Sequence, residues 1–170
     1  MAIEYRGKRD LRFVAAHRGG QLDIARHRLL SIWAADCAEL VLPLFTEKFP
    51  EDDRPSKAIA VGRAWSRGEA TVGEARKAAF AAHAAAKGLV DTSAREVARS
   101  AGHAVSTAHM ADHALVAAAY AIKAVRMASG ISEVMTTVNF ACLLTREHLP
   151  EEIRELVLSS MELDWLLLGD

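Results

Sequence analysis

The chain has 170 residues and a formal net charge of −1 at pH 7, long enough for one domain that buries its own apolar core. Its near balance of charge excludes an overall basic field that would draw it to nucleic acid or to an anionic membrane surface. Hydrophobic residues form 51% of the chain, aromatic residues only 6%, and alanine is the most common residue. This composition is typical of closely packed helices with few large side chains between them.

Both cysteines, Cys37 and Cys142, fall in segments with helical patterns, so we expect buried, reduced thiols rather than a disulfide scaffold. The N-terminal sequence MAIEYRGKRD is charged and lacks the apolar core of a signal peptide. The longest apolar run, residues 114–122, is too short to cross a bilayer. These features predict a soluble, cytoplasmic protein with no membrane partner.

Residues 1–20 are expected to form an N-terminal arm that ends in the flexible pair Gly19-Gly20. The arm is expected to dock through three apolar residues, Leu11, Phe13 and Val14. Asp23 is a good N-cap for a helix whose apolar residues recur every three or four positions. Pro43 should kink or end that helix.

A turn rich in proline and acidic residues, FPEDDRPSK, separates this helix from a short one that Pro55 can start and Gly68 can stop. Thr71 and Glu74 then have the spacing of a capping box, in which each side chain bonds the other residue's backbone amide. The pattern predicts an alanine-rich helix that runs to Lys87 and ends before Gly88.

Ser93 and Glu96 repeat the capping-box spacing and predict the start of a long helix that runs to about Ala128. Two further helices, over residues 131–148 and 151–168, are expected to pack on the bundle as the C-terminal part of one helical domain, 1–170. No alternating pattern and no long internal repeat is present. We therefore predict an all-α, single-domain bundle of about six helices with a long, alanine-rich central helix.

One side of this central helix carries a stripe of small and apolar residues at alternating four- and three-residue spacing. Its members are Val97, Ala101, Ala104, Ala108, Ala111, Leu115, Ala118, Ile122 and Val125. Small side chains in such a stripe allow a partner helix to approach closely, which predicts a position in the middle of the bundle.

The same helix contains the stretch GHAVSTAHMADHALVAAAY, which holds three of the seven histidines. His109 and His113 are four residues apart, so two imidazoles on one helix face could bind one metal ion, with Asp112 or another histidine completing the shell. The glutamate of the H-E-x-x-H motif is missing, and His103 falls about 80° away around a continuous helix. We therefore favour tight packing of the histidines, predict no cofactor, and keep His109 and His113 as weak metal candidates.

A polar strip remains on this helix, and His83 on the preceding alanine-rich helix is the residue most expected to meet it. The candidate polar pocket consists of His83, His103, His109, Asp112, His113 and Tyr120. Its alternative interpretation is purely structural, because a buried imidazole can hydrogen-bond a carbonyl or carboxylate at a helix crossing.

The chain contains no phosphate-binding loop, dinucleotide fingerprint, C-x-x-C or G-x-S-x-G motif. Asp36 is more readily interpreted as half of an ion pair, with Arg54, Arg63 or a histidine, than as a catalytic acid. Cys37 lies in the middle of a helix, unlike an activated thiol nucleophile. The basic residues are scattered and lack a helix-turn-helix context. We therefore predict neither an enzyme nor a nucleic-acid-binding protein.

Six strings occur in order between residues 10 and 125: DLRFVAAHRGG, IWAADCAELVLPLF, PEDDRPSKAI, RAWSRGE, ARKAAFAAHAAA and AGHAVSTAHMADHA. In this order they resemble the immunity proteins of bacterial polymorphic toxin systems. The resemblance implies a small cytoplasmic protein that binds a cognate toxin and neutralises it, by covering its active site or by holding it inactive. It brings no functional residues with it.

Two hypotheses therefore stand beside each other: an immunity protein, or a helical protein that binds a metal or small molecule in a histidine-lined pocket. For the first, the acidic turn FPEDDRP could meet a basic toxin surface, and an exposed Trp65 or Trp165 could anchor the contact. The leucine-rich end WLLLGD either packs on the bundle or joins a second copy in a homo-oligomer.

Overall fold

A computed structural model describes residues 9–129 and 134–161, and these residues form helices and connecting turns with no β-strand. After two short 3₁₀ helices, Leu11–Phe13 and Ala16–Arg18, come eight α-helices. They are α1 (Ile24–Val41), α2 (Pro43–Thr46), α3 (Arg54–Ser66), α4 (Val72–Ala86), α5 (Thr92–Ser106), α6 (His113–Ser129), α7 (Val134–Arg146) and α8 (Glu151–Leu158). The predicted all-α class is confirmed, with more helices than the six expected.

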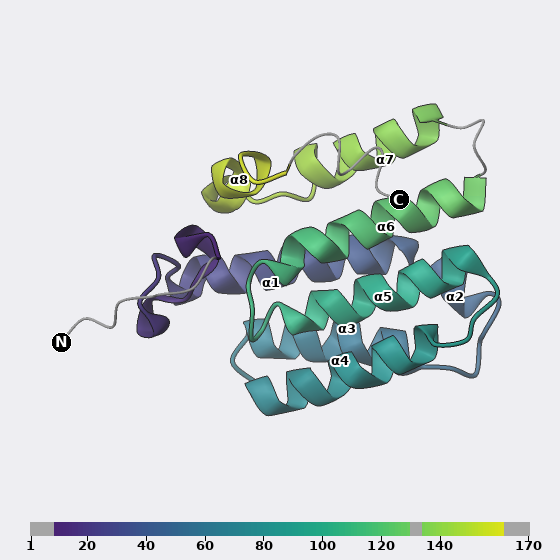
Figure 1. The fold of residues 1–170 in the computed structure, drawn as a ribbon, viewed down its shortest axis with the longest axis horizontal. Coiled ribbons are helices and arrows are strands. Elements are labelled where there is room, and N and C mark those ends of the chain that lie inside the picture. The colour runs from purple at the N-terminus through teal and green to yellow at the C-terminus, as the bar shows by residue number, and fades with distance from the viewer. Residues whose placement is uncertain (1–8, 130–133, 162–170) are drawn as a thin grey trace.

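The longer helices lie roughly side by side along the long axis of the molecule (Figure 1). Helix α5 lies in the middle and packs against α1, α2, α3, α4 and α6. Helix α4 forms one outer edge, whereas α7 and α8 cover the opposite side, where α7 contacts α6 and α8 contacts α1. Within the described residues, no helix is both long and apolar enough to cross a membrane.

Helix α5 can occupy the centre because most of its buried side chains are small. Its buried residues are Ser93, Ala94, Glu96, Val97, Ala98, Ser100, Ala101, Gly102, Ala104, Val105 and Ser106. A Cβ built on Gly62 of α3 would lie only 3.5 Å from Cα of Val105, so the two backbones nearly touch. Ser100 donates a 2.8 Å hydrogen bond to the carbonyl of Ala117 on α6, which satisfies a hydroxyl inside this crossing.

Larger side chains fill the space between α1 and the helices that cover it. Leu30, Trp33 and Phe45 are fully buried. Trp33 also donates a 3.1 Å hydrogen bond from Nε1 to the carbonyl of Leu144, which joins α7 to α1. The C-terminal helices are thus attached to the same core as the rest of the bundle.

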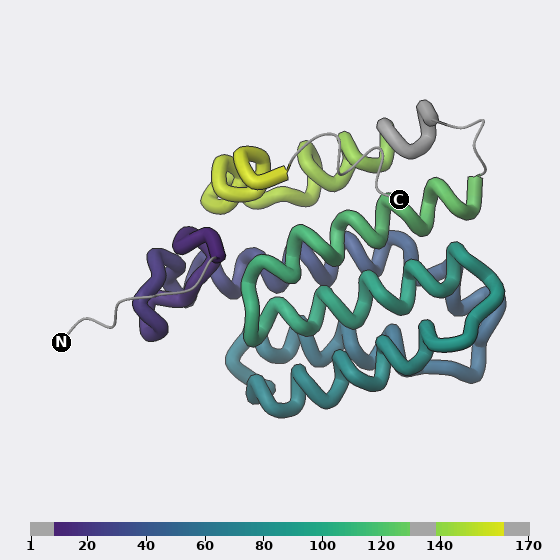
Figure 2. The backbone as a smooth tube through the Cα atoms, viewed as in Figure 1, coloured from purple at the N-terminus to yellow at the C-terminus, as the bar shows by residue number. Residues whose placement is uncertain are grey.

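The predicted long helix over residues 93–128 is wrong, because the chain reverses between Ser106 and His113. Figure 2 shows the short turn through which α5 passes into α6, so that the two helices lie antiparallel. At the break, Nε2 of His27 on α1 donates a 2.6 Å hydrogen bond to the carbonyl of Thr107. A continuous helix would need that carbonyl for the amide four residues later.

Local hydroxyl groups help the reversal. Ser106 donates to the carbonyl of Gly102 at 2.8 Å, and Thr107 donates to the carbonyl of His103 at 3.3 Å. Such back-bonding competes with a regular helix. The stripe that looked continuous in the sequence therefore belongs to two helices, which turn their small residues toward the same crossing.

Of the two capping boxes predicted at helix starts, one is confirmed and the other is wrong. The capping box is present at Thr71, where the amides of Glu74 and Thr71 each bond the other residue's side chain, at 3.2 and 2.7 Å. The second box is wrong: Asp91 caps α5 by accepting a 2.8 Å bond from the amide of Ala94. Glu96 is instead completely buried. It accepts hydrogen bonds from two arginines on its own helix, Arg95 and Arg99.

The expected ion pair at Asp36 is confirmed, with Arg63 at 2.8 Å. Of the two thiols, Cys37 is buried as expected, whereas Cys142 is exposed. In the arm, Phe13 and Val14 are buried, but Leu11 remains 39% exposed.

The last predicted helix is shorter than expected. Helix α8 ends at Leu158, where the hydroxyls of Ser159 and Ser160 both bond the carbonyl of Leu156. The predicted continuation over 162–168, the end WLLLGD and Trp165 lie outside the described residues.

Candidate functional site

Three histidines and a tyrosine from three different helices meet beside the α5–α6 turn. His83 comes from α4, His103 from α5, and His113 and Tyr120 from α6. The ring centroid of His103 lies 4.8 Å from that of His83 and 5.0 Å from that of His113. We call these residues, together with His109 on the turn, the histidine cluster.

His103 is the centre of the histidine cluster. Its Nδ1 lies 2.9 Å from Nδ1 of His113, so the N–H of one neutral ring donates a hydrogen bond to the nitrogen of the other. Its ring stacks on Tyr120 with 5.3 Å between centroids and 11° between planes. The guanidinium of Arg99 lies 5.7 Å from the centre of the Tyr120 ring. The rings therefore pack on one another.

Gly102 makes room for this packing. A Cβ added there would come within 2.7 to 2.9 Å of three atoms of the His83 ring. The imidazole of His83 therefore lies directly against the backbone of α5, in space that any larger residue at position 102 would take. The glycine is a steric requirement of the histidine cluster, despite the low helix propensity of that residue.

Burial keeps the histidine cluster uncharged near neutral pH. Desolvation is the main cause of the lowered pKa of His83, His109 and His113. The pKa of His103 falls to about 3, because its burial is reinforced by the neighbouring His83, His113 and Arg99. Neutral imidazoles retain a lone pair for a hydrogen bond or a ligand.

The structure brings five of the six predicted pocket residues together but holds the sixth differently. The ring of His109 lies 5.4 Å from that of His113, and its buried Nδ1 has no hydrogen-bond partner. Asp112 is bound instead by Arg9, through bonds of 2.9 and 2.6 Å. Within residues 9–129 and 134–161, no three His, Cys, Asp or Glu side chains are arranged to hold a metal ion.

The expectation that His103 lies far from the His109–His113 pair is wrong for the same reason as the long helix. The angle of about 80° assumed one continuous helix. The reversal at Thr107 brings His103 against His113 instead. A hydrogen bond across the fold, from His27 to the carbonyl of Thr107, accompanies that reversal.

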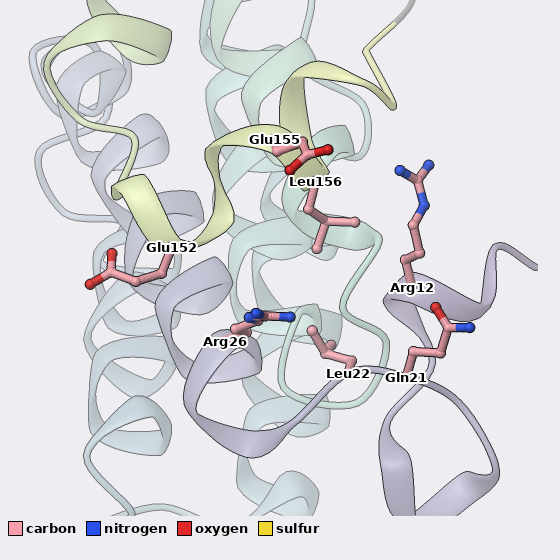
Figure 3. A pocket seen from close by; sticks show the side chains of 7 residues that line it. All are labelled: Arg12, Gln21, Leu22, Arg26, Glu152, Glu155 and Leu156. Carbon is pink, nitrogen blue, oxygen red and sulfur yellow. The ribbon is translucent and has the colours of Figure 1, made fainter.

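One pocket lies beside the histidine cluster, and another lies beside the N-terminal arm. One, of about 320 Å³, borders the histidine cluster and is lined by Met110, Asp112, His113, Leu115, Val116, Ser160 and Met161. The other, of about 290 Å³, lies between the arm, the start of α1 and α8 (Figure 3). Two arginines, Arg12 and Arg26, and two glutamates, Glu152 and Glu155, line this second pocket, so its charges balance.

Two predicted toxin contacts, the acidic turn FPEDDRP and an exposed Trp65, fall on described residues. The structure supports neither of them. In the FPEDDRP turn, Arg54 bonds Asp52 and Lys57 pairs with Asp53 at 2.6 Å, so most of its negative charge is neutralised locally. Trp65 is only 9% exposed, and its ring lies 4.7 Å from that of His27. It is a core residue, and the prediction of an exposed anchor there is wrong.

The outer surface of α4 is a feature that the sequence interpretation missed. Phe80 is 70% exposed, although most large apolar residues of the described chain are buried. Arg76, Lys77 and Lys87 are exposed around it. The signal available in the sequence is an aromatic residue, Phe80, in the same helical stripe as the basic residues Arg76 and Lys87.

A family model matches residues 20–151, from the end of the arm to the start of α8. The chain belongs to the family described as Imm-5 like putative immunity protein. The resemblance seen in the sequence strings is thereby confirmed. None of the curated proteins and none of the solved structures matches the chain.

Two helical glycines provide a test of the packing at the histidine cluster. In Gly62→Ala the new methyl group meets only ordinary contacts, so the better helix propensity of alanine should raise the free energy of unfolding by about 0.5–1 kcal/mol. In Gly102→Ala it collides with His83, which should make this variant less stable than Gly62→Ala by about 1–3 kcal/mol. Urea unfolding measures both. Equal stabilities would contradict the account, and adding His83→Ala should remove the deficit of Gly102→Ala.

The lowered pKa values predict a protein that is less stable in acid. Unfolded imidazoles take up protons near pH 6.5, whereas the buried ones do so only at lower pH. The unfolded state therefore binds more protons below pH 6.5, and stability is complete above that pH and is lost as the pH falls. His103 alone should lower the free energy of unfolding by about 2 kcal/mol between pH 7 and pH 5.

Urea unfolding at pH 7, 6 and 5 measures this loss, and His103→Phe keeps a ring while removing the proton site. The variant should lose less stability between pH 7 and 5 than the wild type. The same pH slope in both proteins would show that His103 does not hold a lowered pKa.

Proposed function

We propose that this protein binds a cognate toxin and neutralises it by direct protein–protein contact, inside the cell that makes both. The observation that carries the proposal is the match of residues 20–151 to an immunity-protein family. The matched segment contains α1 to α7, so it includes the whole central packing around α5.

A close-packed helical body is suited to this role. A stable protein–protein interface takes about 800 Å² from each partner. The surface of this protein is 9418 Å², so one face is enough to cover a toxin's active site. Because α5 is surrounded by other helices, such a face is presented with little conformational freedom, and little entropy is lost when it binds.

The test uses the toxin domain encoded beside the gene of this protein. We expect co-expression to restore growth to cells that make the toxin, and the two purified proteins to form a one-to-one complex by size-exclusion chromatography with light scattering. Loss of toxicity without a complex would contradict neutralisation by contact. A matched control is an immunity protein of another system, which should neither bind nor protect.

A second candidate function is ligand binding at the histidine cluster, with a small molecule or a metal ion held by His83, His103, His109, Asp112, His113 and Tyr120. Two observations favour it: the buried Nδ1 of His109 lacks a hydrogen-bond partner, and His113 and Asp112 help to line a pocket of about 320 Å³. A buried polar atom without a partner is unfavourable, and a ligand atom would satisfy it.

Elemental analysis of untagged protein tests the metal form of this candidate. A stoichiometric metal that is lost in the double variant His109→Ala, His113→Ala would support it. Protein that stays free of metal after incubation with equimolar Zn²⁺ and desalting would remove it.

A further inference from the structure

We infer that the toxin docks on the outer face of α4, and that the toxin surface which meets it is acidic and surrounds an apolar pocket for Phe80. This inference rests on the proposed function and deepens it by naming the surface and the chemistry of its partner. We define the α4 face by the exposed residues that lie on the same side of the helix as Phe80: Gly73, Arg76, Lys77, Phe80, Ala84 and Lys87.

Phe80 is not needed by the fold. The opposite side of α4 supplies the contacts to the bundle through its buried alanines, Ala75, Ala79, Ala82, Ala85 and Ala86. Phe80 projects into solvent with 70% of its surface exposed. An exposed aromatic ring of this size gains free energy when a partner covers it, and aromatic residues dominate interface hot spots.

The charges around Phe80 identify the kind of partner. Within the described residues, no carboxylate forms an ion pair with Arg76, Lys77 or Lys87. The one acidic residue of the helix, Glu74, is engaged with Thr71 in the capping box. By contrast, the arginines of α3 and its C-cap, Arg54, Arg63 and Arg67, are each bridged to carboxylates. Three cations without an ion pair around an apolar centre, against the single carboxylate of Glu74, are complementary to an acidic surface.

The α4 face is also held in place. The helix packs on α3 and α5, begins with a capping box, and is followed by Gly88 in the left-handed conformation with φ of 80°. Just beyond it, Val90 is 94% exposed. Helix α4 forms an outer edge of the molecule (Figures 1 and 2). A rigid, unobstructed helix face can dock without rearrangement.

The test measures the Kd for the toxin domain encoded beside the gene, with wild-type protein and two variants of the α4 face. Phe80→Ala should raise Kd by about 30-fold or more, as expected for an anchor residue. The double variant Arg76→Glu, Lys77→Glu should also weaken binding, and it should lose the decrease in affinity with added NaCl that the wild type shows.

Controls of the same chemistry lie on other faces. Ile24 on α1 is 56% exposed, and Arg146 on α7 is exposed. Ile24→Ala and Arg146→Glu should bind like the wild type. Because all these side chains are exposed, circular dichroism and thermal melts of every variant should match the wild type.

The outcomes separate the inference from the function on which it rests. Tight binding by the wild type that neither α4 variant weakens would overturn the α4 face and leave the proposed function intact. No binding by the wild type would contradict the proposed function and the inference with it. Self-association of the wild type that Phe80→Ala abolishes would assign the face to a second copy and overturn the toxin assignment.

Discussion

The close approach of five helices to α5 is the constraint on which the rest of this structure depends. It requires small residues along α5, and it leaves almost no free volume, so a single added methyl group at position 102 meets the ring of His83. Polar groups inside the crossing must find partners there, as the hydroxyl of Ser100 does on α6. The helices around α5 are consequently fixed relative to one another.

The same constraint explains the histidine cluster. Because α4 and α6 both lie against α5, histidines from three separate helices are forced into contact and must stay neutral, with the pKa of His103 lowered to about 3. Their hydrogen bond and ring stacking join α6 to α5 beside the turn, and the edge contact between His83 and His103 joins α4 to α5. The cluster supports the body of the protein, while α4 presents its charged and aromatic side to solvent.

The sequence alone was sufficient to predict the features that depend on interactions between neighbouring residues. The Thr71 capping box, the N-cap at Asp23 and the stops at Gly68 and Gly88 all follow from local hydrogen bonding and backbone preference. It failed where distant contacts matter: His27 bonds the carbonyl of Thr107 at the helix break from 80 positions away, and Arg9 binds the carboxylate of Asp112. Helical periodicity carries no information about either contact. The position of Phe80 in a stripe with Arg76 and Lys87, by contrast, can be found from the sequence alone.

Family membership and surface chemistry together support the proposed function. The chain belongs to an immunity-protein family, and its rigid body presents a basic helix face centred on an exposed aromatic ring. The most direct test is the structure of the complex with the toxin encoded beside the gene. We expect Phe80 to be buried in the toxin, with toxin carboxylates in contact with Arg76 and Lys77. A complex formed through another face, with Phe80 still in solvent, would contradict the account.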